Sequence, residues 1–186
     1  MKKFLLALGL TLIAGVAAAA NPQVVLDTSK GPITVELYPD AAPASVANFL
    51  QYVKDKHYDG TIFHRVVKDF VVQGGGMDAS MKERPTRAPI KNEAAKAYKA
   101  GLKNDRGTLA MARTGDPDSA TSQFYINLKN NDFLNYPSRD GYGYAVFGKV
   151  IKGMDVVDAI ADAPTVPGDV PATPILIKSA RTSGSK

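Results

Sequence analysis

The chain has 186 residues, of which 45% are hydrophobic, and its formal net charge at pH 7 is +5. It has no cysteine, which excludes a disulfide framework and thiolate chemistry. Lys and Arg alternate with Asp and Glu instead of forming a basic stretch with interleaved aromatics. This mixing predicts a solvated surface and argues against nucleic-acid binding.

The N-terminus has the organisation of a secretory signal. Two lysines follow the first methionine, residues 4–16 are apolar, and small residues at 18–20 suit a cleavage site. A retained membrane anchor is the alternative, but the apolar run is short, contains glycine and ends in alanines instead of a charged stop signal. We therefore expect export and removal of residues 1–20. One domain, 21–186, would remain and would not contact the membrane.

The mature chain begins with signals for a hairpin and a helix. Residues 23–29 and 33–38 are β-rich, and Lys-Gly-Pro at 30–32 supplies a turn between them. Residues 43–56 start with a proline and carry apolar side chains at i, i+3, i+4 and i+7. This spacing predicts an amphipathic helix with one face turned to a core.

A second hairpin and a long loop follow. Residues 61–67 and 70–73 read as paired strands joined by a short turn. Residues 75–107 have little strand signal and only a short helical possibility near 93–99. A connection of this length inside a compact domain usually serves a site.

The C-terminal half predicts more strands and one more helix. Strand candidates are residues 108–112, 123–128, 144–150 and 174–180, and residues 155–163 form a second short amphipathic helix. Many short strands with only two helices predict an all-β dominated fold, either a barrel or a sandwich.

The inventory of reactive residues excludes several mechanisms. The two histidines, His57 and His64, do not have metal-type spacing, and a zinc site would need further carboxylate ligands. No Gly-x-Ser-x-Gly elbow is present, and the glycines at 74–76 do not open a helix after a dinucleotide-type strand. We therefore expect neither a metal nor a cofactor.

Two adjacent segments do indicate a site. Phe-His-Arg-Val-Val at 63–67 and Phe-Val-Val-Gln-Gly-Gly at 70–75 bring Arg65, Phe70 and Gln73 close together on neighbouring strands. The two-residue period of a strand places Arg65 on the face opposite to its neighbours. An Arg and a Gln between apolar strand residues need partners or a ligand.

These segments resemble the cyclophilins, most closely the periplasmic bacterial branch. The matching blocks, in chain order, are FHRVV with FVVQGG, then AMAR at 110–113, SQFYI at 122–126 and VFGKV at 146–150. The resemblance covers residues 24–180. It implies an eight-stranded antiparallel closed β-barrel capped by two α-helices, in agreement with the strand and helix pattern.

The resemblance also implies roles for individual residues. Arg65 stands at the catalytic arginine and Gln73 at the polar residue beside it. The implied substrate-binding positions are Phe70, Val71, Tyr125 and Leu134 in a proline pocket, Ala112 and Arg113 on a strand whose backbone grips the residue before proline, Gln123 as a second polar contact, and Phe133 and Tyr144 at the rim. Phe133 replaces the Trp usual in eukaryotic members, which removes an indole N–H donor. We therefore expect weak binding of the cyclic peptide cyclosporin.

The implied activity is peptidyl-prolyl cis-trans isomerisation without a covalent intermediate. The partners would be proline-containing unfolded or extended polypeptides, and the signal segment places the enzyme in the periplasm, where we expect a monomer. Two alternatives remain open. A periplasmic chaperone or adaptor could hold such segments without turning them, although it would not need the Arg65 donor. A small-molecule barrel carrier would need an open interior, which the Val, Ile and Phe content of the strands disfavours.

Overall fold

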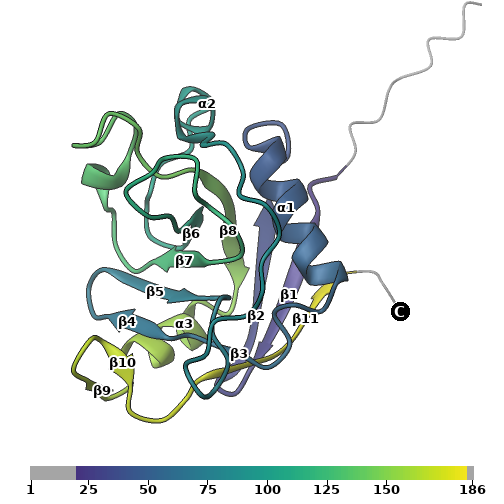
Figure 1. Ribbon diagram of the computed structural model, residues 1–186, viewed down its shortest axis with the longest axis vertical. Helices are drawn as coiled ribbons and strands as arrows, with labels where there is room; N and C mark the ends of the chain where they lie inside the picture. Colours follow the sequence, from purple (N-terminus) through teal and green to yellow (C-terminus); the bar gives the residue numbers. More distant parts are fainter. Residues whose placement is uncertain (1–19, 184–186) are drawn as a thin grey trace, which may run out of the picture.

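The structure, a computed structural model, describes residues 20–183 and is dominated by one curled sheet (Figure 1). Of the predicted signal segment, all but the last residue lies outside the described range. The strands are β1 (Gln23–Thr28), β2 (Gly31–Leu37), β3 (Thr61–Ile62), β4 (Arg65–Val67), β5 (Val71–Gly74), β6 (Thr108–Met111), β7 (Phe124–Asn127), β8 (Val146–Lys152), β9 (Thr165–Val166), β10 (Val170–Pro171) and β11 (Leu176–Thr182). Their order in the main sheet is β3-β11-β1-β2-β8-β6-β7-β5-β4, and β9 pairs with β10 in a separate hairpin.

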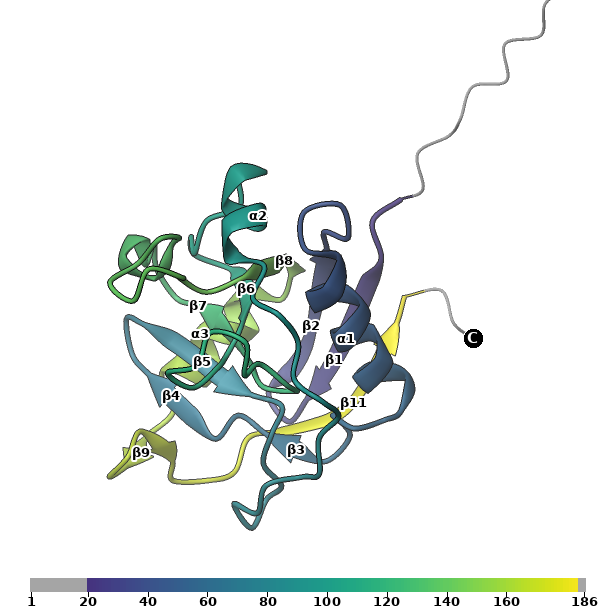
Figure 2. The ribbon, with the colours of Figure 1, turned by 45° about the horizontal axis from the view of Figure 1, so that its top comes forward.

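In the described part of the chain, three α-helices and one 3-10 turn accompany this sheet. They are α1 (Pro43–Lys54), α2 (Ala94–Lys99), α3 (Met154–Ala161) and a single 3-10 turn, η1 (Asp132–Leu134). Helix α1 packs on β8 and β11, whereas α3 packs on β2, β4 and β5 (Figures 1 and 2). The two predicted amphipathic helices are thus confirmed as the two caps. Within residues 20–183, no helix is long and apolar enough to cross a bilayer.

The all-β dominated fold is confirmed, and the closed eight-stranded barrel describes it only approximately. The hydrogen-bonded ladder joins nine strands and ends at β3 and β4. The predicted strand 61–67 is interrupted at Phe63 and His64, because β3 pairs with β11 while β4 pairs with β5. The chain therefore passes from one edge of the curled sheet to the other within this segment.

The first hairpin is fixed by its turn. The Thr28 hydroxyl donates to the Gly31 carbonyl at 2.6 Å and accepts the Lys30 N–H at 3.0 Å. Gly31 has φ +130°, a conformation that a residue with a Cβ rarely adopts. The predicted turn therefore closes β1 and β2 in register from Gln23 opposite Glu36.

The first helix is capped from a distant segment. Its own N-cap, Ala42, offers no side-chain acceptor. The Glu93 carboxylate accepts the N–H groups of Ala44 and Ser45 at 3.0 and 2.8 Å and also the Ser45 hydroxyl at 2.8 Å. A carboxylate at this helix end satisfies unpaired donors and complements the helix dipole. The long loop is thereby tied to α1.

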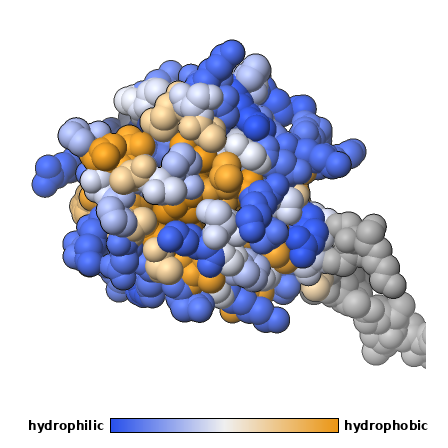
Figure 3. All heavy atoms as spheres, turned by 90° about the horizontal axis from the view of Figure 1, so that it is seen from below, coloured by the Kyte–Doolittle hydropathy of each residue, from blue (hydrophilic) through white to orange (hydrophobic). Residues whose placement is uncertain are grey.

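Apolar side chains form two separate clusters on the two faces of the sheet. The larger fills the inside of the curl and includes Val66 and Val72, which face each other across β4 and β5. The smaller lies on the outer face and contains Val71, Ala110, Tyr125, Leu134 and Val146. Figure 3 shows apolar side chains exposed among hydrophilic ones on one face of the molecule. The outer cluster is the floor of the site described next.

Candidate functional site

Three adjacent strands bring the predicted polar residues into one row. Arg65 on β4 is opposite Gln73 on β5, and Gln73 is opposite Tyr125 on β7. Neighbours in register share a face of the sheet, so the three side chains stand together on the outer face. Arg65 is partly exposed and Val66 is buried, which confirms the alternation predicted from the sequence.

The predicted site residues gather around one pocket on this face. It is lined by Arg65, Phe70, Val71, Gln73, Ala112, Arg113, Tyr125, Phe133, Leu134 and Tyr144. The remaining predicted residue, Gln123, lies beside the pocket and accepts a hydrogen bond from Gln73 Nε2 at 3.0 Å. Val71, Tyr125 and Leu134 are buried, whereas Phe133 is 53% exposed. The Phe133 and Phe70 rings stack with their centroids 5.6 Å apart. The pocket is therefore apolar at its floor and open at an aromatic rim.

Arg65 stands at the polar side of the pocket with most of its donors available. Its Nη1 donates to Gln73 Oε1 at 3.4 Å, the single hydrogen bond that the structure shows for its five N–H groups. The guanidinium carbon lies 5.9 Å from the centre of the Phe70 ring. Nε is 3.9 Å from a carboxylate oxygen of Asp169, in the turn between β9 and β10. The side chain is 40% exposed, so a ligand can reach it.

A chain of polar side chains extends behind Arg65. Gln73 bridges Arg65 and Gln123. His64, the residue directly before β4, contacts the Gln123 side chain. Burial and the neighbouring Arg65 charge lower the pKa of His64, so the imidazole is neutral at pH 7. Its Nδ1 is buried with no hydrogen-bond partner among the described residues. His64 therefore adds no charge to the site.

Arg113 lines the pocket, but its guanidinium is bonded to a neighbouring loop. Its side chain is only 2% exposed and forms an ion pair and hydrogen bond with the Asp140 carboxylate. Nε and Nη2 both donate to the Gly143 carbonyl, at 3.2 and 2.9 Å, and the guanidinium lies 4.2 Å from the centre of the Tyr144 ring. Backbone donors of the loop and Arg113 hold the pKa of Asp140 at about 2. Arg113 thus fixes the loop that carries the pocket rim.

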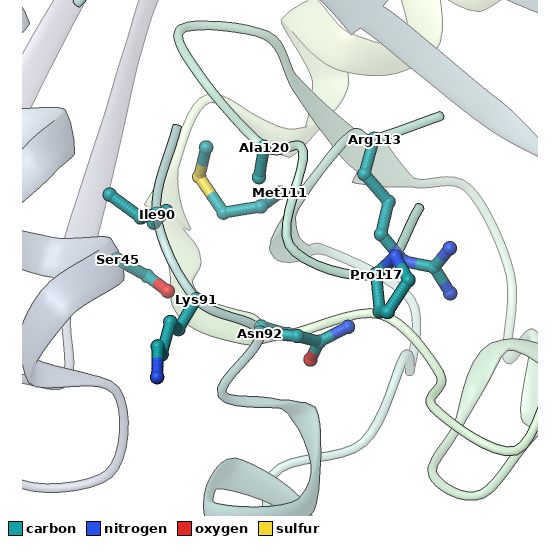
Figure 4. Close-up of a pocket in the computed structure, with 9 residues that line it drawn as sticks. Ser45, Ile90, Lys91, Asn92, Met111, Arg113, Pro117 and Ala120 are labelled. Carbon is teal, nitrogen blue, oxygen red and sulfur yellow. The ribbon is translucent and has the colours of Figure 1, made fainter. Parts of the chain in front are cut away.

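Arg113 also lines a second, smaller cavity (Figure 4). Met111 and Ala120 form its apolar side, and Arg113 and Pro117 lie together at another side. Arg113 is thus common to the lining of both cavities. No group of three or more His, Asp or Glu side chains placed to hold a metal ion occurs between residues 20 and 183.

Comparison with known proteins decides the family. The sequence model described as "Cyclophilin type peptidyl-prolyl cis-trans isomerase/CLD" matches residues 23–182. The chain belongs to the cyclophilin family. Its activity is peptidyl-prolyl cis-trans isomerisation, and the resemblance seen in the sequence is confirmed.

Relatives and solved structures agree with this assignment. This cyclophilin is 55% identical to a peptidyl-prolyl cis-trans isomerase of Acinetobacter baylyi, over 96% of this chain and 94% of the relative. It is 48% identical to peptidyl-prolyl cis-trans isomerase B of Escherichia coli, over 86% and 99%. A Cryptosporidium parvum cyclophilin, crystallised in the presence of the dipeptide Ala-Pro, superposes with a TM-score of 0.72 at 28% identity, covering 88% of this chain and 99% of that one.

Three residues around the cyclophilin pocket were not predicted. Asp169 approaches Arg65, Asp140 holds Arg113, and Asn104 accepts a hydrogen bond from the Tyr125 hydroxyl at 2.8 Å. Asn104 belongs to the long loop whose length indicated a site. No pattern in the sequence connects Asp140 or Asp169 to residues so distant along the chain.

Proposed function

We propose that Arg65 accelerates X-Pro rotation by donating a hydrogen bond to the prolyl nitrogen of a twisted amide. The observation that carries this proposal is a guanidinium with unused donors at the edge of an apolar pocket. The nitrogen lone pair is conjugated in the planar amide and can accept a hydrogen bond only when conjugation is lost. The bond is therefore stronger in the transition state than in the ground state, as catalysis requires.

The energy required is within reach of such a contact. The uncatalysed barrier to rotation is about 18–20 kcal/mol. A ten-thousand-fold acceleration needs about 5.5 kcal/mol, which preorganised donors in a partly dry site can supply together. No covalent bond breaks, so the reaction needs no nucleophile, metal or cofactor.

The neighbouring residues would hold the substrate still while the amide turns. Phe70, Val71, Tyr125 and Leu134 enclose space suited to the apolar pyrrolidine ring. Gln73 would orient Arg65 through its carbonyl oxygen, and Gln123 would in turn orient Gln73.

The rim would contact the chain on either side of the proline. Ala112 uses its N–H in a hydrogen bond to the Gln123 carbonyl at 3.0 Å, so only its carbonyl would serve the residue before proline. Phe133 and Tyr144 would cover the ring from the open side. Arg113 would contribute through its position, because its guanidinium already has partners.

The test replaces the planar guanidinium while retaining the charge. Arg65→Lys keeps a cation but loses the flat multi-donor group, so we expect a fall of at least about tenfold in kcat/KM. Lys68→Ala is the matched control in the same hairpin, since Lys68 is exposed and its ion pair with Asp162 is a surface one. A protease-coupled proline-peptide assay measures both. Wild-type activity in Arg65→Lys would refute the role of the guanidinium.

We also propose that the clients are exported polypeptides. The basic start, apolar run and alanines of residues 1–20 support export. The full chain expressed in a Gram-negative host should appear in the periplasmic fraction, and N-terminal sequencing should find Asn21 first. A chain starting with Met directly before Asn21 is the control that should stay in the cytoplasm. Recovery of the full chain with its first twenty residues intact in the cytoplasm would contradict export.

A further inference from the structure

Asn104 is a buried hub beside the proline pocket. It is 1% exposed and uses both ends of its amide. Its Oδ1 accepts the Tyr125 hydroxyl at 2.8 Å and Asn127 Nδ2 at 3.2 Å. Its Nδ2 donates to Asn135 Oδ1 at 3.1 Å and to the Tyr144 carbonyl at 3.4 Å, and its backbone N–H donates to the same Asn135 oxygen at 2.7 Å.

These hydrogen bonds end on three different walls of the pocket. Tyr125 belongs to the floor, and Tyr144 belongs to the rim. Asn135 directly follows η1, the turn that carries Phe133 and Leu134. The walls come from separate parts of the chain and meet in one buried side chain.

The other side of η1 is held by the same residue. The N–H of Asn131, which precedes η1, donates to the Asn104 carbonyl at 2.8 Å, and Asn131 Nδ2 donates to the Phe70 carbonyl at 3.1 Å. The turn is therefore attached to Asn104 at both of its ends. Burial raises the pKa of Tyr125 well above its ordinary value, so its hydroxyl is protonated and donates at neutral pH.

We infer that Asn104 is a positioning residue of the isomerase, which sets the width of the proline pocket by holding Tyr125, η1 and Tyr144 at fixed separations. The inference rests on the proposed assignment of the pocket. Apolar contacts have no preferred direction, whereas a buried amide with directed hydrogen bonds fixes the relative positions of the groups it joins. Loss of the amide would leave the Tyr125 hydroxyl without its acceptor and would remove the bonds from Nδ2 to Asn135 Oδ1 and to the Tyr144 carbonyl. The backbone N–H of residue 104 would remain bonded to Asn135 Oδ1.

The expected effect is on binding of the proline ring. Pocket walls contact the ring in the planar and the twisted states alike, so their loss raises KM while kcat changes little. A purely structural role would reduce the fraction of folded enzyme, which lowers the apparent kcat and leaves KM unchanged. The split between KM and kcat therefore separates positioning from stability.

The experiment uses Asn104→Ala, Tyr125→Phe and the double variant, with a proline peptide followed by NMR exchange. We expect KM to rise about tenfold in Asn104→Ala and about fivefold in Tyr125→Phe, which loses one buried hydrogen bond and keeps the ring. In the double variant, KM should rise by less than the product of the two single-variant factors, because both substitutions remove the same contact. Thr28→Val is the matched control, a buried hydrogen-bonding side chain in the distant β1–β2 turn.

Each outcome decides the inference. Unchanged KM in both single variants, or full multiplication in the double variant, overturns it. If Asn104→Ala does not fold, Tyr125→Phe decides alone, since its ring fills the same space. Leu134→Ala tests the pocket assignment separately from the role of Asn104. If KM rises in Leu134→Ala and is unchanged in Tyr125→Phe, only the role of Asn104 is refuted. If KM is unchanged in Leu134→Ala as well as in the Asn104 and Tyr125 variants, the pocket assignment itself is refuted.

Discussion

Replacing Arg113 by alanine should loosen the pocket rim and lower stability. The substitution removes the partner of Asp140, two hydrogen bonds to Gly143 and the cation over the Tyr144 ring. Breaking a fully buried ion pair costs roughly 3–5 kcal/mol. The Asp140 side chain is 36% exposed and can regain water, so the loss should be smaller, about 2 kcal/mol.

Thermal unfolding followed by circular dichroism measures this loss. For a domain of this size, about 2 kcal/mol lowers Tm by roughly 4–8 °C. Arg139→Ala is the control in the same loop, because Arg139 is exposed and has no hydrogen bond or ion pair with residues 20–183; its Tm should change by at most about 2 °C. Equal Tm values for the two variants would refute the view that Arg113 fixes the loop.

Three further changes test other parts of the account. In Gly148→Ala the new Cβ would lie 2.6 Å from the Glu36 carbonyl oxygen, so β2 and β8 must separate. Its Tm should fall by at least about 4 °C. Gly115→Ala is the control, because open space surrounds Gly115, and its Tm should not change measurably. The depressed pKa of Asp140 contributes stability that is present above its ordinary value of 3.8 and lost as the pH falls through about 2. The Tm difference between wild type and Asp140→Asn should therefore shrink from pH 5 to pH 2.5, and a constant difference would contradict the ion pair. Wild type should bind cyclosporin weakly by calorimetry, and Phe133→Trp should tighten binding about fivefold or more by restoring an indole donor; nanomolar binding by the wild type would contradict this expectation.

Most helices and strands could be predicted because their signals lie within short stretches of sequence. The Pro43 start and the apolar spacing after it gave the helix that the structure shows as Pro43–Lys54. The two-residue period gave the outward direction of Arg65, since Val66 had to face the core. Gln73 and Tyr125 join it because antiparallel register places them side by side.

The remainder depended on contacts between distant segments. The β9–β10 hairpin was not predicted, because each strand has two residues and lacks apolar alternation. The partner of Arg113 could not be found from its own strand, since Asp140 arrives from a later loop. Asn104 gave no signal of its own, and its importance comes from three walls that meet only in the folded chain.

The most direct test of the central claim measures catalysis and binding of Arg65→Ala in one sample. NMR exchange of an X-Pro peptide gives the on-enzyme isomerisation rate, and titration of the same peptide gives the dissociation constant. A donor that acts only on the twisted amide predicts a fall of at least about a hundredfold in rate with a dissociation constant within about threefold of wild type. An unchanged rate, or a loss confined to binding, would contradict it.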